Sequence, residues 1–276
     1  MIKHIDRETS LCISLASTPS NHGVRFHNYL YGKLGLNFIY KAIAPADIIA
    51  AVAGIRGLNI RGAGVSMPYK QEVIDLLDEL HPSASRINSV NTIVNNDGIL
   101  VGYNTDYTAV HQILRAKLAE LNLDPSQVSV AARGSGGMAN AVVAACADLK
   151  LHGTVVARNH MTGSALAEKY GWEFSTTTPE DADILINITP IGMAETAFSQ
   201  EQSFSDTEIS RAQLVFDAVA WPVETPLIKA AKRLNIPIIN GGSVVALQAA
   251  EQFILYTGKH PSTELIQAAE QYAQQS

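Results

Sequence analysis

The feature that most constrains the fold is an alternation, repeated along the chain, of short apolar segments with helical patterns of ten or more residues. Residues 11–17 alternate with period 2, residues 24–35 carry apolar side chains at helical spacing, and residues 37–43 have the pattern of another strand. This order predicts an α/β protein with a mostly parallel sheet. At about 150 residues per domain, 276 residues correspond to one large or two ordinary domains.

Proline and glycine delimit several of these elements. Pro45 and Gly57 stand near the start and at the end of one expected helix. Pro68 is expected to open the next helix, because the missing N–H costs nothing in a first turn. The buried face of that helix would consist of Ile74, Leu77 and Leu80. Residues 90–104 predict a β-hairpin whose turn is Asn96-Asp97-Gly98.

The pattern restarts after the polar stretch 121–127, which predicts a domain boundary there. Strands are expected at 127–132, 153–158, 182–189 and 213–219, with helices between them. Two further helices are expected at 242–258 and 261–275.

Composition excludes several classes of protein. Hydrophobic residues make up 47% and charged residues 17%, which argues against a disordered chain. The 26 acidic residues exceed the 20 basic ones and no basic cluster occurs, so we expect no nucleic-acid partner. No apolar stretch approaches the ~18 residues of a membrane span, and the first ten residues are too polar for a secretory signal. Cys12 and Cys146 lie in apolar runs, as buried thiols do, so we expect a cytoplasmic protein without disulfides.

The segment 133–139 has the spacing of a dinucleotide-binding loop. Gly134, Gly136 and Ala139 match G-x-G-x-x-G/A between an expected strand and an expected helix. The glycines would allow a tight turn and close approach of a pyrophosphate, which the free N–H groups of the helix start would bind. The other loop residues that would meet the cofactor are Ser135, Gly137 and Met138. A plain strand-to-helix turn is the competing interpretation.

Arg158 indicates which dinucleotide would bind. It ends the next expected strand, 24 residues after Gly134, where an NAD-binding unit usually carries Asp or Glu. An arginine suits the 2′-phosphate of NADP, so NADP is favoured over NAD. A solvated cation at a strand end is the alternative.

Lys70 and Asp106 are candidates for proton transfer, which the oxidation of an alcohol requires. Each follows an expected strand, and the carboxyl ends of strands are where open α/β sheets bind ligands. Taken singly, a lysine at the position of Lys70 is more often a solvent-facing charge, and Asp106 fits a helix cap with Thr105 equally well.

Six short motifs that occur in a fixed order along the chain indicate a particular protein family. They are Val-Ser-Met-Pro-Tyr-Lys at 65–70, Ser-Val-Asn-Thr at 89–92, Asn-Thr-Asp at 104–106, the glycine loop, Asn-Ile-Thr-Pro-Ile-Gly-Met at 187–193, and Gln-Ala-Ala-Glu-Gln-Phe at 248–253. Over nearly its whole length the chain resembles the shikimate dehydrogenase family, and most closely its shikimate-dehydrogenase-like subgroup.

The resemblance implies an N-terminal α/β substrate domain, residues 1–107 completed by 240–276, and a Rossmann-type NADP-binding domain at 108–239. It implies that Lys70 transfers the proton with Asp106 as its partner. Ser66, Asn91 and Gln248 would then bind substrate hydroxyls. The residues implied on the nicotinamide side are Thr189, Pro190 and Met193.

One segment departs from the family pattern. Where the family has a Ser-x-Ser-Pro segment that binds the substrate carboxylate, this chain has Asn21, Gly23 and Val24. Asn21 is one candidate donor at that end of the substrate, and the other candidates are Ser14, Ser17, Ser20 and Arg25. A related cyclic hydroxy acid such as quinate or an aminoshikimate is an alternative substrate.

The resemblance therefore implies an NADP-dependent oxidoreductase of aromatic amino acid biosynthesis that interconverts shikimate, or a close analogue, and 3-dehydroshikimate. A quinate- or aminoshikimate-type dehydrogenase using NAD is one alternative, and a nicotinamide-cofactor-binding sensor with little catalysis is another. We expect a monomer or homodimer that acts on a small cyclic hydroxy acid. No metal is expected, because the histidines lack metal-ligand spacing.

Overall fold

The computed structural model describes residues 5–275. The chain divides into two compact units: one runs as far as Thr105 and resumes at Ala246, and the other is Asp106–Val245. The chain passes from the first unit to the second at the start of helix α4 (Thr105–Glu120), and it returns to the first unit inside helix α9 (Gly241–Thr257). The assignment of a substrate domain and a dinucleotide domain to these parts of the chain stays a prediction.

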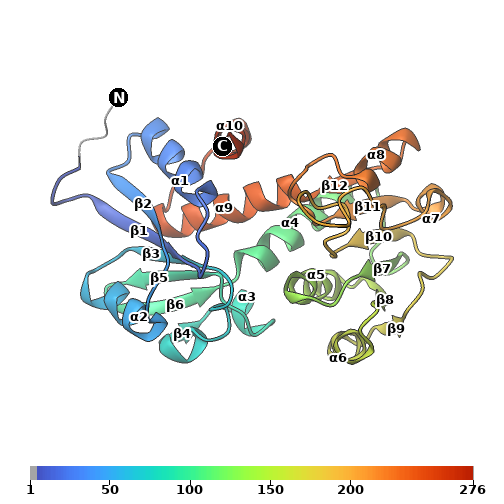
Figure 1. The fold of residues 1–276 in the computed structure, drawn as a ribbon, viewed down its shortest axis with the longest axis horizontal. Helices are drawn as coiled ribbons and strands as arrows, with labels where there is room; N and C mark the ends of the chain where they lie inside the picture. Colours follow the sequence, from blue (N-terminus) through green and yellow to red (C-terminus); the bar gives the residue numbers. More distant parts are fainter. Residues whose placement is uncertain (1–4, 276) are drawn as a thin grey trace. The chain divides into compact units, whose positions relative to one another are not determined.

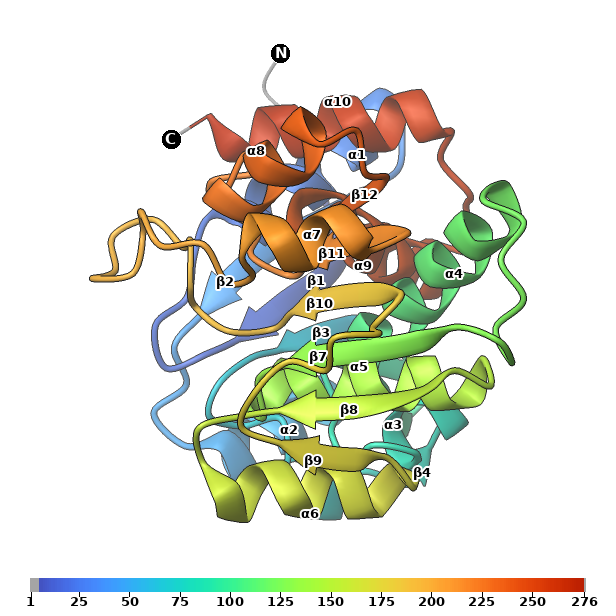
Figure 2. The same ribbon diagram turned by 90° about the vertical axis from the view of Figure 1, so that its right-hand side faces the viewer.

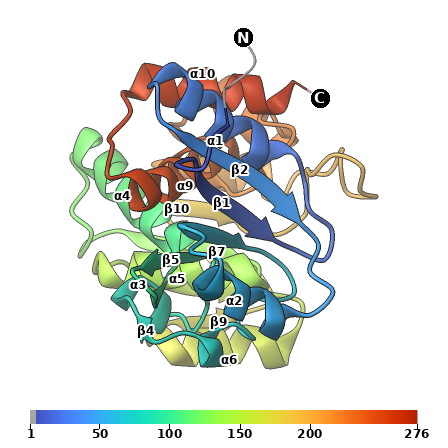
Figure 3. The same cartoon turned by 90° about the vertical axis from the view of Figure 1, so that its left-hand side faces the viewer.

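The first unit is built on a six-stranded sheet in the order β2-β1-β3-β5-β6-β4. Its strands are β1 (Ser10–Leu15), β2 (Phe38–Ile43), β3 (Gly62–Val65), β4 (Glu79–Leu80), β5 (Thr92–Asn96) and β6 (Ile99–Tyr103). Strands β2, β1 and β3 are parallel, whereas β3, β5 and β6 pair antiparallel (Figure 3). The predicted α/β class is therefore confirmed, with an antiparallel hairpin added to the parallel strands.

Helices cover both faces of this sheet. Core side chains of α1 (His22–Lys33), α9 and α10 (Thr263–Gln274) pack on one face, around Phe26, Tyr31 and Phe253. On the other face lie α2 (Ile48–Gly57) and the short α3 (Pro82–Ser85). Each face thus removes one layer of apolar side chains from water, which is the main stabilising term for such a fold.

Local chemistry sets the ends of these elements. The Asp47 side chain accepts hydrogen bonds from Ile49 N (2.8 Å) and Ala50 N (3.0 Å) and so begins α2. The hairpin turn forms as predicted, because Asp97 and Gly98 both adopt positive φ angles, 51° and 96°. Gly35, with φ 64°, follows α1 in the left-handed conformation expected of a helix stop.

The helix predicted to open at Pro68 does not form. The chain continues in turns to a short 3₁₀ helix, η1 (Ile74–Leu76), and the peptide bond before Pro68 is cis. The carbonyl of Lys70 accepts a hydrogen bond from Val90 N (2.7 Å). This carbonyl therefore bonds to another segment of the chain and not to an N–H group in the next turn of a helix. The apolar side chains nevertheless pack against the core as expected; they are Ile74, Leu77 and Leu80.

The second unit contains a six-stranded, fully parallel sheet in the order β12-β11-β10-β7-β8-β9. Its strands are β7 (Ser129–Arg133), β8 (His152–Val156), β9 (Glu173–Ser175), β10 (Ile184–Asn187), β11 (Leu214–Asp217) and β12 (Ile238–Asn240). Figure 2 shows β10, β7, β8 and β9 side by side. This is the doubly wound order of a Rossmann-type fold, so the predicted fold class holds for this unit as well.

Two pairs of helices flank the second sheet (Figure 1). They are α5 (Gly137–Asp148) with α6 (His160–Tyr170), and α7 (Asp206–Arg211) with α8 (Pro226–Arg233). Helix α5 is almost entirely small and apolar on its buried side, which lets it approach the sheet closely. Cys12 and Cys146 are both buried free thiols. No helix within residues 5–275 combines the length and the apolarity needed to cross a bilayer.

A buried histidine lies in the aromatic core of the first unit. His27 stacks on Tyr40 with ring centroids 4.3 Å apart, and its side chain is fully buried. Burial lowers the pKa of His27 to about 3, outweighing the Gln252 side chain, which raises it. The neutral ring is therefore the form that the folded protein holds.

This burial predicts an acid-dependent loss of stability. Because the folded-state pKa lies below the ordinary value near 6.5, the unfolded chain binds the extra proton, and the free energy of unfolding falls as pH drops from about 6.5 towards 3. The slope from this group approaches ~1.4 kcal/mol per pH unit. Urea unfolding between pH 7 and 5 should show this slope in the wild type and lose it in His27→Phe. The exposed His260, changed to Gln, is the control, and an unchanged slope in His27→Phe contradicts the account.

Candidate active site

The turn between β7 and α5 depends on Gly134. Its φ of 128° is one that residues with a side chain rarely adopt, and an added Cβ would lie 3.0 Å from the backbone C and O of Ile188. Gly136 caps α5 and Gly137 begins it, and a Cβ on either would meet no atom within 4 Å. The turn is thus closed against the loop after β10 on one side and open at the helix start on the other.

A pocket of about 730 Å³ lies at the carboxyl edge of the second sheet. Five of the residues predicted to bind a cofactor line it: Gly134, Ser135, Arg158, Thr189 and Pro190. The other lining residues are Arg133, Val156, Ala157, Asn159, Thr176, Ile191, Phe198 and Glu201. The first turn of α5 supplies Gly136, Gly137, Met138 and Ala139, which do not line this pocket, and neither does Met193, which is 38% exposed.

The residues around Arg158 fit a phosphate group. The end of β8 carries no acidic residue, since Val156 is followed by Ala157, Arg158 and Asn159. Asn159 caps α6 by accepting a hydrogen bond from Thr162 N (3.1 Å), and the hydroxyls of Thr162 and Ser135 lie 2.7 Å apart. One guanidinium and two hydroxyls are donors suited to phosphate oxygens.

The loop after β10 is held by a buried carboxylate that sequence reasoning missed. Asp217 accepts hydrogen bonds from Asn187 Nδ2 (2.9 Å) and from the Thr225 hydroxyl (2.6 Å). Asn187 in turn accepts a bond from the Thr189 hydroxyl (2.6 Å). Burial raises the pKa of Asp217 despite these donors. The chain of contacts fixes Thr189 and Pro190 at the mouth of the pocket.

Asn91 is the centre of a buried polar network in the first unit. Its Oδ1 accepts hydrogen bonds from Thr105 N (2.8 Å), the Thr105 hydroxyl (3.2 Å) and the Thr92 hydroxyl (2.9 Å). Gln248 donates from Nε2 to the Thr105 hydroxyl (3.2 Å). Gln252, which was not predicted, donates to the Thr92 hydroxyl (2.9 Å). Asn91 and Gln248 are thus brought together through Thr105.

Three other predicted residues, Lys70, Asp106 and Ser66, lie near this network along the chain. Lys70 is half-buried, and its carbonyl bonds to Val90, the residue before Asn91. Asp106 directly follows Thr105 in the first turn of α4. Ser66 is exposed just after β3, and its N–H donates to Leu15 O (2.9 Å).

Asn21 lies apart from these contacts, exposed at the N-cap of α1, and its side chain makes no capping hydrogen bond. Two residues on, a Cβ added to Gly23 would lie 3.5 Å from the Tyr40 ring and 3.7 Å from its hydroxyl oxygen, which is ordinary contact. A Cβ added to Gly64 would lie only 2.8 Å from the same hydroxyl oxygen. Sequence reasoning missed the position of the Tyr40 hydroxyl near Gly23 and Gly64. The spacing of Tyr40 in its strand is that of an ordinary core residue, so no sequence signal indicates this position.

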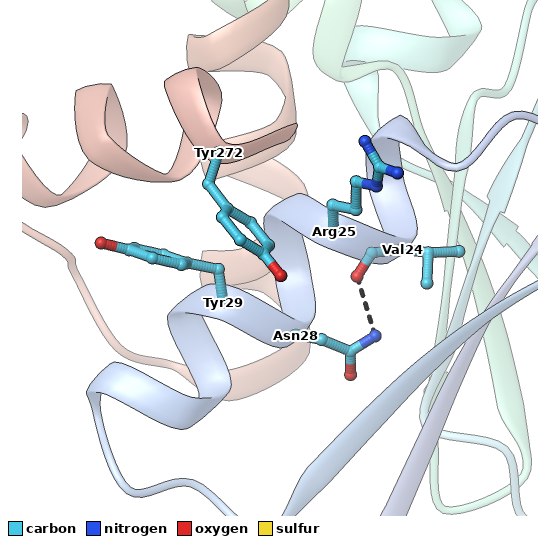
Figure 4. A pocket seen from close by; sticks show the side chains of 5 residues that line it. All are labelled: Val24, Arg25, Asn28, Tyr29 and Tyr272. Atoms are coloured by element: carbon cyan, nitrogen blue, oxygen red, sulfur yellow. Dashed lines mark hydrogen bonds between the residues drawn. The ribbon is translucent and has the colours of Figure 1, made fainter. Parts of the chain in front are cut away.

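A second, shallower pocket of about 370 Å³ lies between α1 and α10 (Figure 4). It is lined by Val24, Arg25, Asn28, Tyr29 and Tyr272. Asn28 Nδ2 donates to Val24 O (2.8 Å) within the helix, and Arg25 donates to the carbonyl of Gln275. These side chains serve helix packing, and none of the predicted site residues lies there.

Known proteins are similar to this chain over most of its length. Residues 20–93 match the family model described as the shikimate dehydrogenase substrate binding domain. A shikimate dehydrogenase-like protein of Haemophilus influenzae is 48% identical over 275 residues, 98% of each chain. The chain belongs to the shikimate dehydrogenase family. A shikimate dehydrogenase (NADP(+)) of Dehalococcoides mccartyi is 35% identical and covers 91% of this chain and 92% of its own.

The fold agrees with that of a family member solved with its cofactor. A shikimate dehydrogenase in complex with NADP+ superimposes with a TM-score of 0.86 at 29% identity, over 97% of this chain and 96% of that one. The expected family membership is therefore confirmed. Among residues 5–275, no three or more His, Cys, Asp or Glu side chains gather as a metal site would require.

The strained turn gives a direct test of the loop. Gly134→Ala should lower the free energy of unfolding by about 1–3 kcal/mol, because alanine is disfavoured at this φ and its Cβ meets the Ile188 backbone. Gly137→Ala is the matched control, since it begins a helix with open space around it and should not destabilise the protein. Chemical denaturation measures both, and equal stability of the two variants would refute the strain at Gly134.

Proposed function

We propose that this protein is an NADP-dependent oxidoreductase that interconverts shikimate, or a close analogue, and the corresponding 3-dehydro ketone. The observation that carries the proposal is the pocket at the edge of the Rossmann-type sheet, where the glycine turn, Thr189 and Arg158 line one cavity. Membership of the shikimate dehydrogenase family over the full chain supports the reaction class. We further propose that the protein acts in the cytoplasm.

The residues present fit an adenosine dinucleotide with a 2′-phosphate. The backbone at Gly136 and Gly137 is free of side chains and begins a helix, so a pyrophosphate would meet N–H groups and the positive end of the helix dipole. Arg158, with no acid beside it, favours a phosphate over a free ribose hydroxyl. When bound, the nicotinamide supplies the acceptor or donor of the hydride.

The proposed chemistry at the protein side is proton transfer. During oxidation of the alcohol, Lys70 takes the proton of the reacting hydroxyl, and during reduction it returns that proton to the oxygen. Asp106 is proposed to orient the ammonium group and to balance its charge. The support for these roles is the position of Lys70 in the turns after β3 and of Asp106 in the first turn of α4, together with the motifs Val-Ser-Met-Pro-Tyr-Lys and Asn-Thr-Asp.

The hydrogen-bond network indicates how the hydroxyls would be recognised. Because Asn91 Oδ1 already accepts three hydrogen bonds, its Nδ2 is the atom free to act as a donor to a ligand oxygen. Gln248 uses Nε2 towards Thr105, which leaves Oε1 to accept from a ligand hydroxyl. A ring with neighbouring hydroxyl groups offers both partners, and Ser66 would add a third contact.

The residues at positions 21 and 23, Asn21 and Gly23, favour a second candidate, a quinate- or aminoshikimate-type dehydrogenase that uses NAD. The family's serine pair is absent here, and fewer hydrogen bonds to a carboxylate cost ~1.5–3 kcal/mol each. A nicotinamide-binding sensor with little turnover is the candidate of another class. Initial rates with each acid and each dinucleotide, followed by nicotinamide absorbance, separate the three.

Lys70→Ala tests the catalytic assignment. The proton-transfer role predicts a fall in kcat of about 10²- to 10⁴-fold, with a much smaller change in KM, because the lost interaction belongs to the transition state. The exposed Lys41, changed to Ala, should leave both constants unchanged. A Lys70→Ala enzyme with nearly wild-type kcat would exclude the assignment.

Gly23→Ser tests the substrate end of the site. The new side chain fits, because its Cβ makes only ordinary contacts with Tyr40, and its hydroxyl restores a donor. We expect KM for shikimate to fall about tenfold with kcat little changed, from the worth of one hydrogen bond to a charged group. Gly32→Ser, on the same helix with open space around it, is the control. An unchanged KM would mean that the carboxylate binds elsewhere.

A further inference from the structure

Arg133 is a second guanidinium in the dinucleotide pocket that neither the glycine motif nor the family motifs single out. It is the last residue of β7, directly before Gly134, and it lines the same cavity as Arg158. Its side chain is 28% exposed, so neighbouring residues do not cover it completely. The lining of the pocket therefore carries two arginines against one carboxylate, Glu201.

The direction of the side chain follows from its contacts. Arg133 Nη2 donates to the hydroxyl of Thr178 (2.7 Å), which lies beyond the end of β9. Strand β8 lies between β7 and β9 in the sheet. The Arg133 side chain therefore extends from the end of β7 to the segment that follows β9. Arg133 and Arg158 both line the pocket that this segment borders through Thr176.

Neighbouring groups hold Arg133 without neutralising it fully. Its guanidinium carbon lies 4.7 Å from the centre of the Phe204 ring, and Glu208 Oε1 is 3.9 Å from Nη2. The carboxylate of Glu208 already accepts from the Ser205 N–H (2.6 Å) and hydroxyl (2.7 Å) through Oε2. The hydrogen bond to Thr178 uses one of five guanidinium donors, and the buried Nε has no partner among the described residues.

We propose that Arg133 is a specificity-determining residue that, with Arg158, recognises the adenosine 2′-phosphate of the dinucleotide. The inference rests on the proposed NADP-linked function and extends it to a second cation. A planar guanidinium stacked on an aromatic ring and fixed by one hydrogen bond is preorganised, so little side-chain entropy is lost when a phosphate binds.

Equilibrium binding to the purified protein tests the proposal without turnover. Isothermal titration with NADP+, NAD+ and adenosine 2′,5′-bisphosphate would compare the wild type with Arg133→Met, Arg133→Lys and the control Arg211→Met on the surface of α7. We expect Arg133→Met to weaken binding of the two 2′-phosphorylated ligands about tenfold, as the loss of one charge-assisted contact does, and to leave NAD+ nearly unchanged. Arg133→Lys should recover part of the loss, and Arg211→Met should bind as the wild type.

Two results would overturn the role of Arg133 alone. One is wild-type affinity for NADP+ in Arg133→Met, and the other is an equal loss for NADP+ and NAD+, which would give Arg133 a purely structural role at Thr178 and Glu208. A wild-type protein that binds none of the three ligands would overturn the proposed function as well, so the two failures are distinguishable.

Discussion

The first unit depends on the hydrogen bonds that converge on the Asn91 carboxamide. This one group joins β5 to the start of α4, and through Thr105 and Thr92 it reaches Gln248 and Gln252 on α9. Asn91 is only 3% exposed, so each hydrogen bond to its Oδ1 that is left unmade would cost the unit about 1–3 kcal/mol. The network thus ties the returning C-terminal helix to the sheet and fixes the direction in which Asn91 can offer a donor.

The second unit meets a different constraint, the recognition of an anion by an acidic chain. The net charge is −6, so overall electrostatics do not attract a dinucleotide, and binding must come from groups placed locally. Under the proposed function the groups for this lie at the carboxyl edge of the parallel sheet, where the glycine turn, Arg133 and Arg158 line one pocket. The buried Asp217 adds rigidity by holding the loop that carries Thr189.

Sequence patterns predicted the elements whose signals are local. The hairpin turn at Asp97 and Gly98, the stop at Gly35 and the strand–loop–helix at Gly134 all follow from backbone conformations that few residues tolerate. The helix expected from Pro68 failed because its pattern of apolar residues fits turns as well as a helix. In the structure the Lys70 carbonyl accepts a hydrogen bond from Val90 N, and no local pattern in the sequence indicates such a bond.

The same limit applies to the candidate site. Motifs indicated Arg158, Asn91 and Gln248, whereas Arg133 and Tyr40 occupy ordinary strand positions, and their importance depends on what lies across the sheet. The contact of Asp217 with Asn187 likewise joins residues that are far apart in the chain. Contacts of this kind are set by tertiary packing and are visible only when the strand order is known.

The central claim is that a hydride passes between a ring carbon of the substrate and a nicotinamide. Shikimate carrying deuterium on the carbon of its 3-hydroxyl, incubated with the enzyme and NADP+, tests this directly when the reduced cofactor is examined by NMR. The account predicts that the deuterium appears on the nicotinamide ring and not in water. Reduced cofactor without deuterium, or deuterium released to the solvent, would contradict it.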